Sequence, residues 1–275
     1  MAAGAREKLD LAGRMQAALE SAPPVHAASG APAARCRLCG AAGYRRGVTF
    51  LPALDAAMID LDGTMVDTLP DFAVAIGLML DELGRPAVTP AIVATMIGQG
   101  ADHLVRAVLE HVAGGVAVDA TFVAQGQQRF RQHYGEVNGR HAVVFPGVVG
   151  GLEALRRRGL RLACLTNKPT AFAETLLATT KLDGFFDIVR GGDAFLRIKP
   201  DPMPLVQTCE ALGTLPARTL MVGDSSNDAR AARAAGCPVV LATYGYNHGE
   251  PIREVDADGF FDSLADVSRL LDAKG

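Results

Sequence analysis

Two aspartates two positions apart, Asp60 and Asp62, stand at the end of the short apolar run 57–61. Side chains in extended backbone repeat with a period of two, so both carboxylates are expected to point the same way. One of them can attack phosphorus directly while the other carries a proton to or from the leaving oxygen. Gly63 lets the chain turn tightly and leaves main-chain N–H groups free to face phosphate. The segment therefore favours covalent phosphoryl transfer.

Further polar residues follow other predicted strands or lie in a loop on the same side of the sheet. They are Thr166, Asn167 and Lys168, then Lys199, and finally Asp224 with Asp228. Ligands gather beyond the carboxyl ends of the strands in an open parallel sheet, so these groups are expected to converge. Crowded carboxylates repel one another and call for a cation, and hard oxygen ligands suit Mg²⁺. The metal and Lys199 would neutralise phosphate oxygens as charge develops.

Each of these motifs has a simpler structural explanation when it is taken alone. An isolated Asp-x-Asp is often a turn, Asp224 and Ser225 could cap the helix that follows, and a single lysine such as Lys199 is usually solvated. Their joint occurrence at one predicted edge of a sheet is what indicates a phosphoryl-transfer site.

The elements that must position these groups are visible in the alternation of patterns after Pro146. Helices are expected at about 148–158, 171–179, 202–212 and 228–235, and strands at 160–165, 186–189, 219–222 and 239–242. This repetition predicts an α/β fold, a Rossmann-like parallel sheet with helices on both faces, and the strand 57–61 belongs to the same sheet. Residues 54–69 and 146–275 would form this core domain.

Between the first strand and the rest, the chain shows four helical patterns and no convincing strand. They cover about 69–83, 90–96, 101–112 and 120–134. We therefore expect residues 70–145 to form an inserted all-helical cap domain. Residues 1–53 are rich in Ala, Gly and Pro and predict a disordered N-terminal extension, or a stretch that does not belong to the working protein.

Composition excludes some classes of partner. The chain of 275 residues is 49% hydrophobic and has a net charge of −3. Proteins that bind nucleic acid usually show a basic stripe, so nothing in this charge balance calls for a nucleic-acid partner. The sequence contains no run of about 18 apolar residues, so no membrane span is expected. Five cysteines, an odd number, argue against a disulfide framework, and with no signal-peptide pattern the expected location is the cytoplasm. The oligomeric state is not indicated by the sequence.

The pair Cys36 and Cys39, with His26 nearby, is compatible with a partial zinc site. Structural zinc normally takes four ligands in paired spacing, and no second pair exists in the sequence. A zinc site remains an open alternative for this segment.

The motifs together resemble those of the haloacid dehalogenase superfamily of phosphotransferases, over about residues 56–272. The matching positions are Asp60 to Thr64, Thr166, Lys199, and Asp224 with Asp228. The position of the helical insertion is similar to that of the superfamily's cap. The acid at Asp62, which dehalogenating relatives lack, favours a phosphatase, because an alkoxide leaving group needs a proton.

The resemblance also implies roles for individual residues. Asp60 would be the nucleophile and a metal ligand, and Asp62 the general acid and base whose main-chain carbonyl binds the metal. Asp224 would complete the Mg²⁺ ligands, and Asp228 would orient Lys199 or a water at the metal. The expected metal set is Asp60, Asp62, Asp224 and Asp228. Thr166, Asn167 and Lys199 would hold the phosphoryl group. Apart from the resemblance, the residue types and positions add Gly63, Gln99 and Lys168 as expected substrate contacts.

Closer similarity is to phosphoglycolate phosphatases. It rests on the segments 166–170, 191–193, 199–200, 222–225 and, most particularly, Thr243-Tyr244-Gly245-Tyr246-Asn247. This similarity implies hydrolysis of a small phosphorylated metabolite, 2-phosphoglycolate, to glycolate and phosphate. A sugar-phosphate phosphatase acting, for example, on N-acetylmuramate 6-phosphate stays open as an alternative. So do a phosphosugar mutase and a non-catalytic protein that binds a phosphorylated metabolite.

The cap is expected to select the substrate. Its glycine-containing loop Ile97–Gly100, which includes Gln99, is expected to be flexible and to fold over the site. A substrate carboxylate would need a cation or donor near its far end, and the candidates are Lys168, His103 and Arg106.

Overall fold

The structure is a computed structural model and describes residues 53–272. All of the predicted N-terminal extension except its last residue lies outside this range, and so do His26, Cys36 and Cys39. The expected disorder and the possible zinc site therefore stay predictions.

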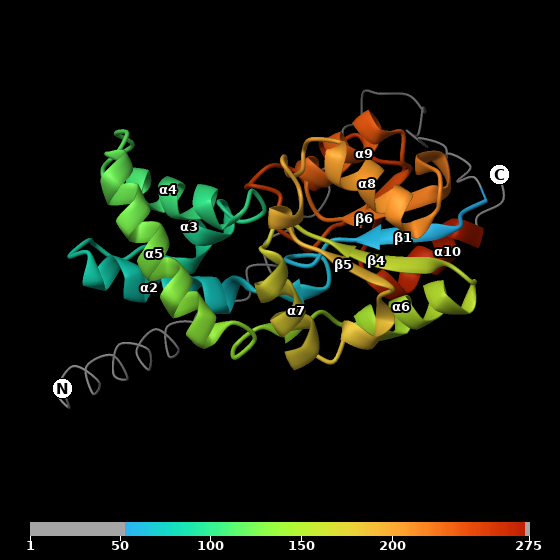
Figure 1. The fold of residues 1–275 in the computed structure, drawn as a ribbon, viewed down its shortest axis with the longest axis horizontal. Coiled ribbons are helices and arrows are strands. Elements are labelled where there is room, and N and C mark those ends of the chain that lie inside the picture. Colours follow the sequence, from blue (N-terminus) through green and yellow to red (C-terminus); the bar gives the residue numbers. More distant parts are fainter. Residues whose placement is uncertain (1–52, 273–275) are drawn as a thin grey trace, which may run out of the picture.

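A six-stranded parallel sheet in the order β5-β4-β1-β6-β7-β8 forms the larger part of the molecule (Figure 1). The strands are β1 Ala56–Ile59, β4 Arg161–Leu165, β5 Ile188–Arg190, β6 Thr219–Gly223, β7 Val239–Ala242 and β8 Gly259–Phe261. The chain runs from β1 outward to one edge and then returns to build the other half. The strand order therefore reverses at β1, where open α/β sheets bind their ligands.

Helices cover both faces of this sheet, as the alternating sequence pattern predicts (Figure 1). They are α6 Val148–Arg157, α7 Thr170–Thr179 and α10 Val267–Asp272 on one face, and α8 Met203–Leu212 and α9 Ser226–Ala235 on the other. The strand residues divide accordingly: Ala57 and Ile59 pack in one hydrophobic cluster, and Ala56 and Met58 in the other. This division explains why β1 is apolar throughout, since both of its faces are buried.

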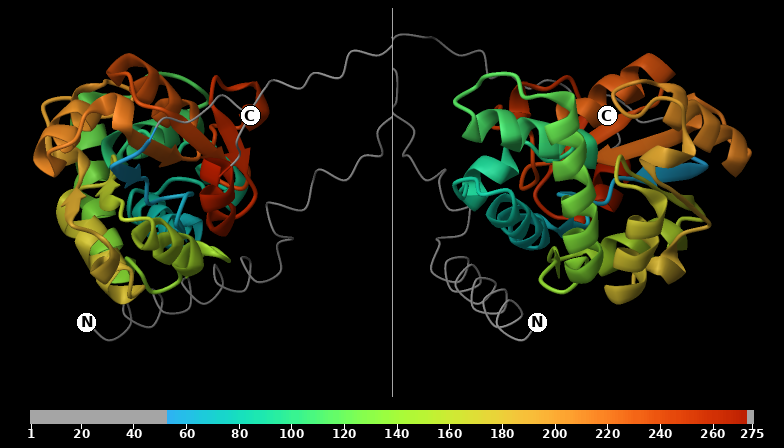
Figure 2. Two further views of the ribbon diagram at one scale, coloured as in Figure 1. Left: turned by 90° about the vertical axis from the view of Figure 1, so that its right-hand side faces the viewer. Right: turned by 60° about the vertical axis from the view of Figure 1, so that its left-hand side comes forward.

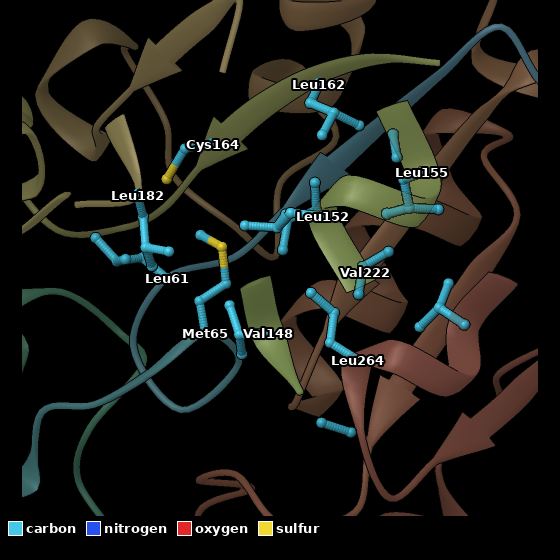
Figure 3. Packing of buried hydrophobic residues seen from close by; sticks show 14 of the residues in the cluster. Leu61, Met65, Val148, Leu152, Leu155, Leu162, Cys164, Leu182, Val222 and Leu264 are labelled. Atoms are coloured by element: carbon cyan, nitrogen blue, oxygen red, sulfur yellow. The ribbon is translucent and has the colours of Figure 1, made fainter. Parts of the chain in front are cut away.

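The loop after β1 is anchored in the core by its own apolar side chains. Leu61 and Met65 are fully buried and belong to the cluster that includes Val148 and Leu152 of α6 (Figure 3). Each such burial contributes about 2–3 kcal/mol relative to an exposed side chain. The polar residues between Leu61 and Met65 are thereby held in a fixed position.

The inserted helices are α2 Leu69–Glu82, α3 Pro90–Ala94, α4 Ala101–Val112 and α5 Ala120–Val137. They form a body of their own beside the sheet (Figures 1 and 2), with a separate hydrophobic cluster. Within that cluster the rings of Phe72, Phe130 and Tyr134 stack, with centroids 4.9 to 6.3 Å apart. No helix within residues 53–272 combines the length and apolar character that crossing a membrane requires.

Two very short strands connect the two bodies. β2 Val66–Asp67 pairs antiparallel with β3 Val143–Val144, so the chain enters and leaves the inserted helices side by side. The expectation of no strand in this stretch is wrong at β3. A strand of two residues has too few positions to show a period.

Several short segments complete the description. The sequence does not predict β8, because three residues between Asp258 and Asp262 are too few to show a strand pattern. The remaining elements are the 3₁₀ helices η1 Asp183–Phe185, η2 Gly192–Ala194, η3 Pro216–Arg218, η4 Ile252–Glu254 and η5 Leu264–Asp266.

Candidate active site

Three neighbouring strands of the sheet end in polar residues. Asp60 follows β1, Thr166 follows β4 and Asp224 follows β6, and all three side chains are buried. Because β4 and β6 flank β1 in a parallel sheet, their carboxyl ends meet at one edge. The predicted convergence of these residues is present in the structure.

Lys199 lies at the centre of this edge. Its Nζ is 2.7 Å from Oδ1 of Asp228 and 3.1 Å from Oδ1 of Asp60, and it donates to the carbonyl of Leu165 at 2.9 Å. Burial by itself lowers the pKa of this ammonium, but the carboxylates of Asp228 and Asp60 outweigh that effect and raise it. Lys199 is therefore a permanently charged group in contact with Asp60.

Asp228 both fastens the start of α9 and holds Lys199. Its Oδ2 accepts hydrogen bonds from the main-chain N of Asp224 and of Ser225, each at 3.2 Å, and from Oγ of Ser225 at 2.9 Å. Its Oδ1 accepts from Lys199. Ser225 is the N-cap of α9, and Asp228 is both the third helical residue of its capping box and the charge partner of Lys199.

Asp224 is fixed by donors from two other segments. Oγ1 of Thr64 donates to its Oδ1 at 3.1 Å, and the main-chain N of Tyr246 donates to its Oδ2 at 2.5 Å. Gly63 has a φ of +82°, and a Cβ there would lie 2.2 Å from Oδ2 of Asp224. Only glycine permits this approach of the loop after β1 to the loop after β6.

Three carboxylates at this edge can hold a metal ion. Ligand oxygens of Asp60, Asp224 and Asp228 all lie within 4.8 Å of one another. Burial raises the pKa of Asp60 to about 7 against the opposing charge of Lys199, and burial together with the charges of Asp228 and Asp60 raises that of Asp224 well above its usual range. A hard divalent cation fits this donor set, because it would relieve the repulsion and accept oxygen ligands.

Asp62 is not part of this triad and pairs with Lys168. Nζ of Lys168 lies 2.7 Å and 3.0 Å from the two carboxylate oxygens of Asp62. The same ammonium stands over two rings of the inserted helices, 4.6 Å from the centroid of Phe72 and 4.9 Å from that of Tyr134. The main-chain carbonyl role expected for Asp62 at a metal stays a prediction.

Asn167 connects the core to the loop of the inserted domain. Its Nδ2 donates to the carbonyl of Gly98 at 3.0 Å and to that of Lys199 at 2.9 Å, while its Oδ1 accepts from the N–H of Lys199 at 3.0 Å. Thr166 is buried beside it and accepts from the main-chain N of Lys168 at 3.2 Å. The loop Ile97–Gly100 is therefore drawn onto the sheet edge.

A small cavity lies between the sheet edge and the inserted helices. Its polar lining comes from the core: Asp60, Asp62, Thr166, Asn167 and Lys168. Most of the remaining lining is apolar: the inserted domain contributes Phe72, Ile97, Leu104, Phe130 and Tyr134, and α7 of the core contributes Phe172.

The structure brings only some of the predicted substrate contacts to this cavity. Gly98 and Gly100 line it, whereas Gln99 between them is half-buried and is not part of the lining. His103 and Arg106 are exposed on α4 and do not line it either. Lys168 is the one of the three proposed carboxylate partners that reaches the cavity.

Sequence reasoning missed the function of several supporting residues. Tyr246 holds Asp224 with its main-chain N, while its hydroxyl donates to Asp67 and accepts from the N–H of Leu69. Asn227 donates to the carbonyl of Gly98 at 3.4 Å. The run Thr243-Tyr244-Gly245-Tyr246-Asn247 was the available signal, but its contacts depend on loops that are distant in sequence.

Comparison with known proteins agrees with this geometry. The family model described as haloacid dehalogenase-like hydrolase matches residues 57–242. A phosphoglycolate phosphatase from Thiobacillus denitrificans is 44% identical over 81% of this chain and 98% of its own length. The plasmid-encoded phosphoglycolate phosphatase from Cupriavidus necator is 47% identical over 78% of this chain and 92% of its own.

A solved structure gives the same result for the fold. The crystal structure of a predicted phosphoglycolate phosphatase from Haemophilus somnus aligns with a TM-score of 0.75 and 36% identity, covering 79% of this chain and 97% of the other. With the matched motifs at one sheet edge, the chain belongs to the haloacid dehalogenase-like hydrolase family and is an enzyme of the phosphatase type, similar to phosphoglycolate phosphatases.

Proposed function

We propose that this chain is a Mg²⁺-dependent phosphatase that hydrolyses 2-phosphoglycolate to glycolate and phosphate through a phosphorylated Asp60. The observation that carries this proposal is one pocket lining that contains both Asp60, whose carboxylate contacts Lys199, and Lys168. The ammonium of Lys168 stands against the rings of Phe72 and Tyr134. A phosphate at Asp60 and Lys199 and a carboxylate at Lys168 would match these two positive charges.

In the first step an oxygen of Asp60 attacks phosphorus, and the bond from phosphorus to the ester oxygen breaks. Both polar contacts of Asp60, the N–H of Leu61 at 2.8 Å and Nζ of Lys199 at 3.1 Å, involve Oδ1. We therefore assign the attack to Oδ2. The leaving oxygen takes a proton from Asp62, which requires that acid to enter the step protonated.

In the second step water attacks the phosphorus of the acyl phosphate while Asp62 removes a proton from it. The bond from phosphorus to Asp60 breaks and phosphate leaves. Asp60, Asp224 and the main-chain carbonyl of Asp62 would hold Mg²⁺, which would supply positive charge for the phosphoryl oxygens. Lys199, fixed by Asp228, adds a second positive charge at the same place.

The character of the cavity wall favours a small substrate over a sugar phosphate. Hydroxyl groups buried against Phe72, Leu104 and Phe130 would lose water without gaining partners, which costs about 1–3 kcal/mol for each group. A two-carbon acid presents one carboxylate to one ammonium. This apolar wall is a poorer match for N-acetylmuramate 6-phosphate, which carries many polar groups. The same holds for a phosphosugar that a mutase would rephosphorylate.

A phosphate-release screen over small phosphomonoesters, with Mg²⁺ and with EDTA, tests the proposal. We expect 2-phosphoglycolate among the best substrates and loss of turnover in EDTA. Rapid turnover of sugar phosphates with 2-phosphoglycolate ignored would contradict the substrate, while the chemistry would stand. Binding of 2-phosphoglycolate without release of phosphate would instead indicate a non-catalytic binding protein. We place this reaction in the cytoplasm, since Cys164, Cys209 and Cys237 are buried free thiols.

A further inference from the structure

We propose that Lys168 restrains the proton donor Asp62 until a substrate carboxylate takes over its ammonium, so that the substrate releases the acid it needs. This inference rests on the proposed function and adds to it a reason for selectivity. Lys168 is then the specificity-determining residue. It affects the rate of the chemical step as well as the affinity for the substrate.

The restraint is visible in the contacts of Asp62. Nζ of Lys168 lies 2.7 Å from Oδ1 and 3.0 Å from Oδ2, so one ammonium occupies both carboxylate oxygens. The two side chains are 2% and 10% exposed, which leaves little water to compete for either. With both oxygens held by one ammonium, the carboxyl group of Asp62 is fixed in its orientation against Lys168. The pair must therefore open before Asp62 is free to turn toward a leaving oxygen.

The surroundings of Lys168 provide the means of exchange. The faces of Phe72 and Tyr134, from α2 and α5, lie 4.6 Å and 4.9 Å from the ammonium and stabilise a cation without an acid. These rings line the same cavity as Asp60 and Asp62. An incoming carboxylate can meet the ammonium there while the rings keep it in place, so Lys168 exchanges one carboxylate partner for another.

A substrate without a carboxylate cannot make this exchange. It would have to separate Lys168 from Asp62 and leave two buried charges without partners, and truncating one partner of such a pair typically costs about 30-fold or more. The arrangement therefore discriminates twice, once in binding and once in releasing Asp62. A lysine that merely held the carboxylate would discriminate only in binding.

The experiment compares 2-phosphoglycolate with ethyl phosphate, which has a methyl group in place of the carboxylate. The variant is Lys168→Met, whose side chain keeps the packing against Phe72 and Tyr134. We expect kcat/KM for 2-phosphoglycolate to fall about 100-fold or more. We expect kcat for ethyl phosphate to rise about tenfold, because Asp62 is then free to carry its proton.

The control is Arg140→Met, which removes a positive charge from an exposed position of the inserted domain and should leave the rates with both substrates unchanged. A parallel loss for both substrates in Lys168→Met, or an unchanged rate with ethyl phosphate, would overturn the release of Asp62. If the unchanged protein turns over other phosphomonoesters but not 2-phosphoglycolate, the proposed substrate fails. These results are distinct from one another.

A second measurement does not depend on the folding of the Lys168 variant. In a crystal structure of Asp60→Asn with 2-phosphoglycolate bound, Nζ of Lys168 should contact the substrate carboxylate. It should also lie farther than about 3.5 Å from both oxygens of Asp62. A bound substrate with the pair of Lys168 and Asp62 still closed would rule out the exchange.

Discussion

The ammonium of Lys199 lies 2.7 Å from Oδ1 of Asp228, and both side chains are almost completely excluded from solvent. The other oxygen of Asp228 holds the first turn of α9. The electrostatics of the sheet edge and the start of a core helix are therefore joined in one carboxylate, so a change there should affect both stability and turnover.

Replacing this acid by its amide, Asp228→Asn, should leave the charge of Lys199 with Asp60 as its remaining acidic partner. Breaking a buried ion pair from one side costs about 3 kcal/mol or more, so we expect the melting temperature to fall by roughly 6–12 °C. Turnover should fall as well, because Lys199 loses the contact that fixes it. Asp256→Asn, in an exposed pair with Arg233, is the control and should melt close to the unchanged protein. Equal melting curves for the two variants would contradict this role of Asp228.

Asp60→Asn should abolish covalent catalysis while preserving the fold. The amide keeps the shape of the side chain but cannot attack phosphorus, so kcat should fall by at least about 1,000-fold. Acid quenching during turnover should trap a hydroxylamine-labile phosphate on the unchanged protein and none on the variant. The matched control is Asp55→Asn, which changes an acid near the other end of β1 that pairs with Arg218. Near-normal turnover in Asp60→Asn would remove this residue from the role of nucleophile.

The metal-free protein should lose stability as the pH rises from near 4 to above 7. Burial raises the pKa of Asp60 from 3.8 to about 7, so in this window the folded protein keeps a proton that the unfolded chain releases. Stability from this group is thus full at low pH and lost above its folded pKa. Melting curves in EDTA should show a smaller decline in Asp60→Asn than in the unchanged protein.

Mg²⁺ should reverse that loss, because the cation takes the place of the proton among the carboxylates. At 100 times its dissociation constant, a ligand that binds only the folded state adds about 2.7 kcal/mol. We expect the rise in melting temperature on adding Mg²⁺ to be larger at pH 8 than at pH 5. An equal rise in melting temperature at pH 5 and pH 8 would show that metal binding is not linked to the titration of Asp60.

Gly63→Ala should disturb the metal ligand Asp224 in addition to straining the backbone at its positive φ. The added Cβ would lie 2.2 Å from Oδ2 of Asp224 and 2.8 Å from the ring of Tyr246. Gly84→Ala is the control, since Gly84 also has a positive φ but no atom lies within 4 Å of its Cβ. The difference in unfolding free energy between the variants should be about 1–3 kcal/mol. Mg²⁺ affinity, measured by calorimetry, should fall only in Gly63→Ala, and equal affinities would argue against the collision.

Local pattern predicted the strongly periodic elements of the fold. α4 and β7 have the bounds expected from the sequence, and α2 begins at the expected Leu69. The pair of β2 and β3 could not be predicted, since two residues such as Val66 and Asp67 carry no period and their partners lie beyond the inserted helices. β8 is hidden for a related reason, because three residues bounded by polar ones give too short a run.

The chemistry at the sheet edge can be predicted from the residue types and their spacing alone. Strand ends can be located from apolar runs, and in a parallel sheet all carboxyl ends point one way, so Asp60, Thr166 and Asp224 had to share an edge. The pairing of Lys168 with Asp62 across 106 positions was decided only by the tertiary structure. So was the hold of Tyr246 on Asp224, a contact between two loops. Such contacts depend on how loops and separate bodies pack, and no repeat or period along the chain encodes that packing.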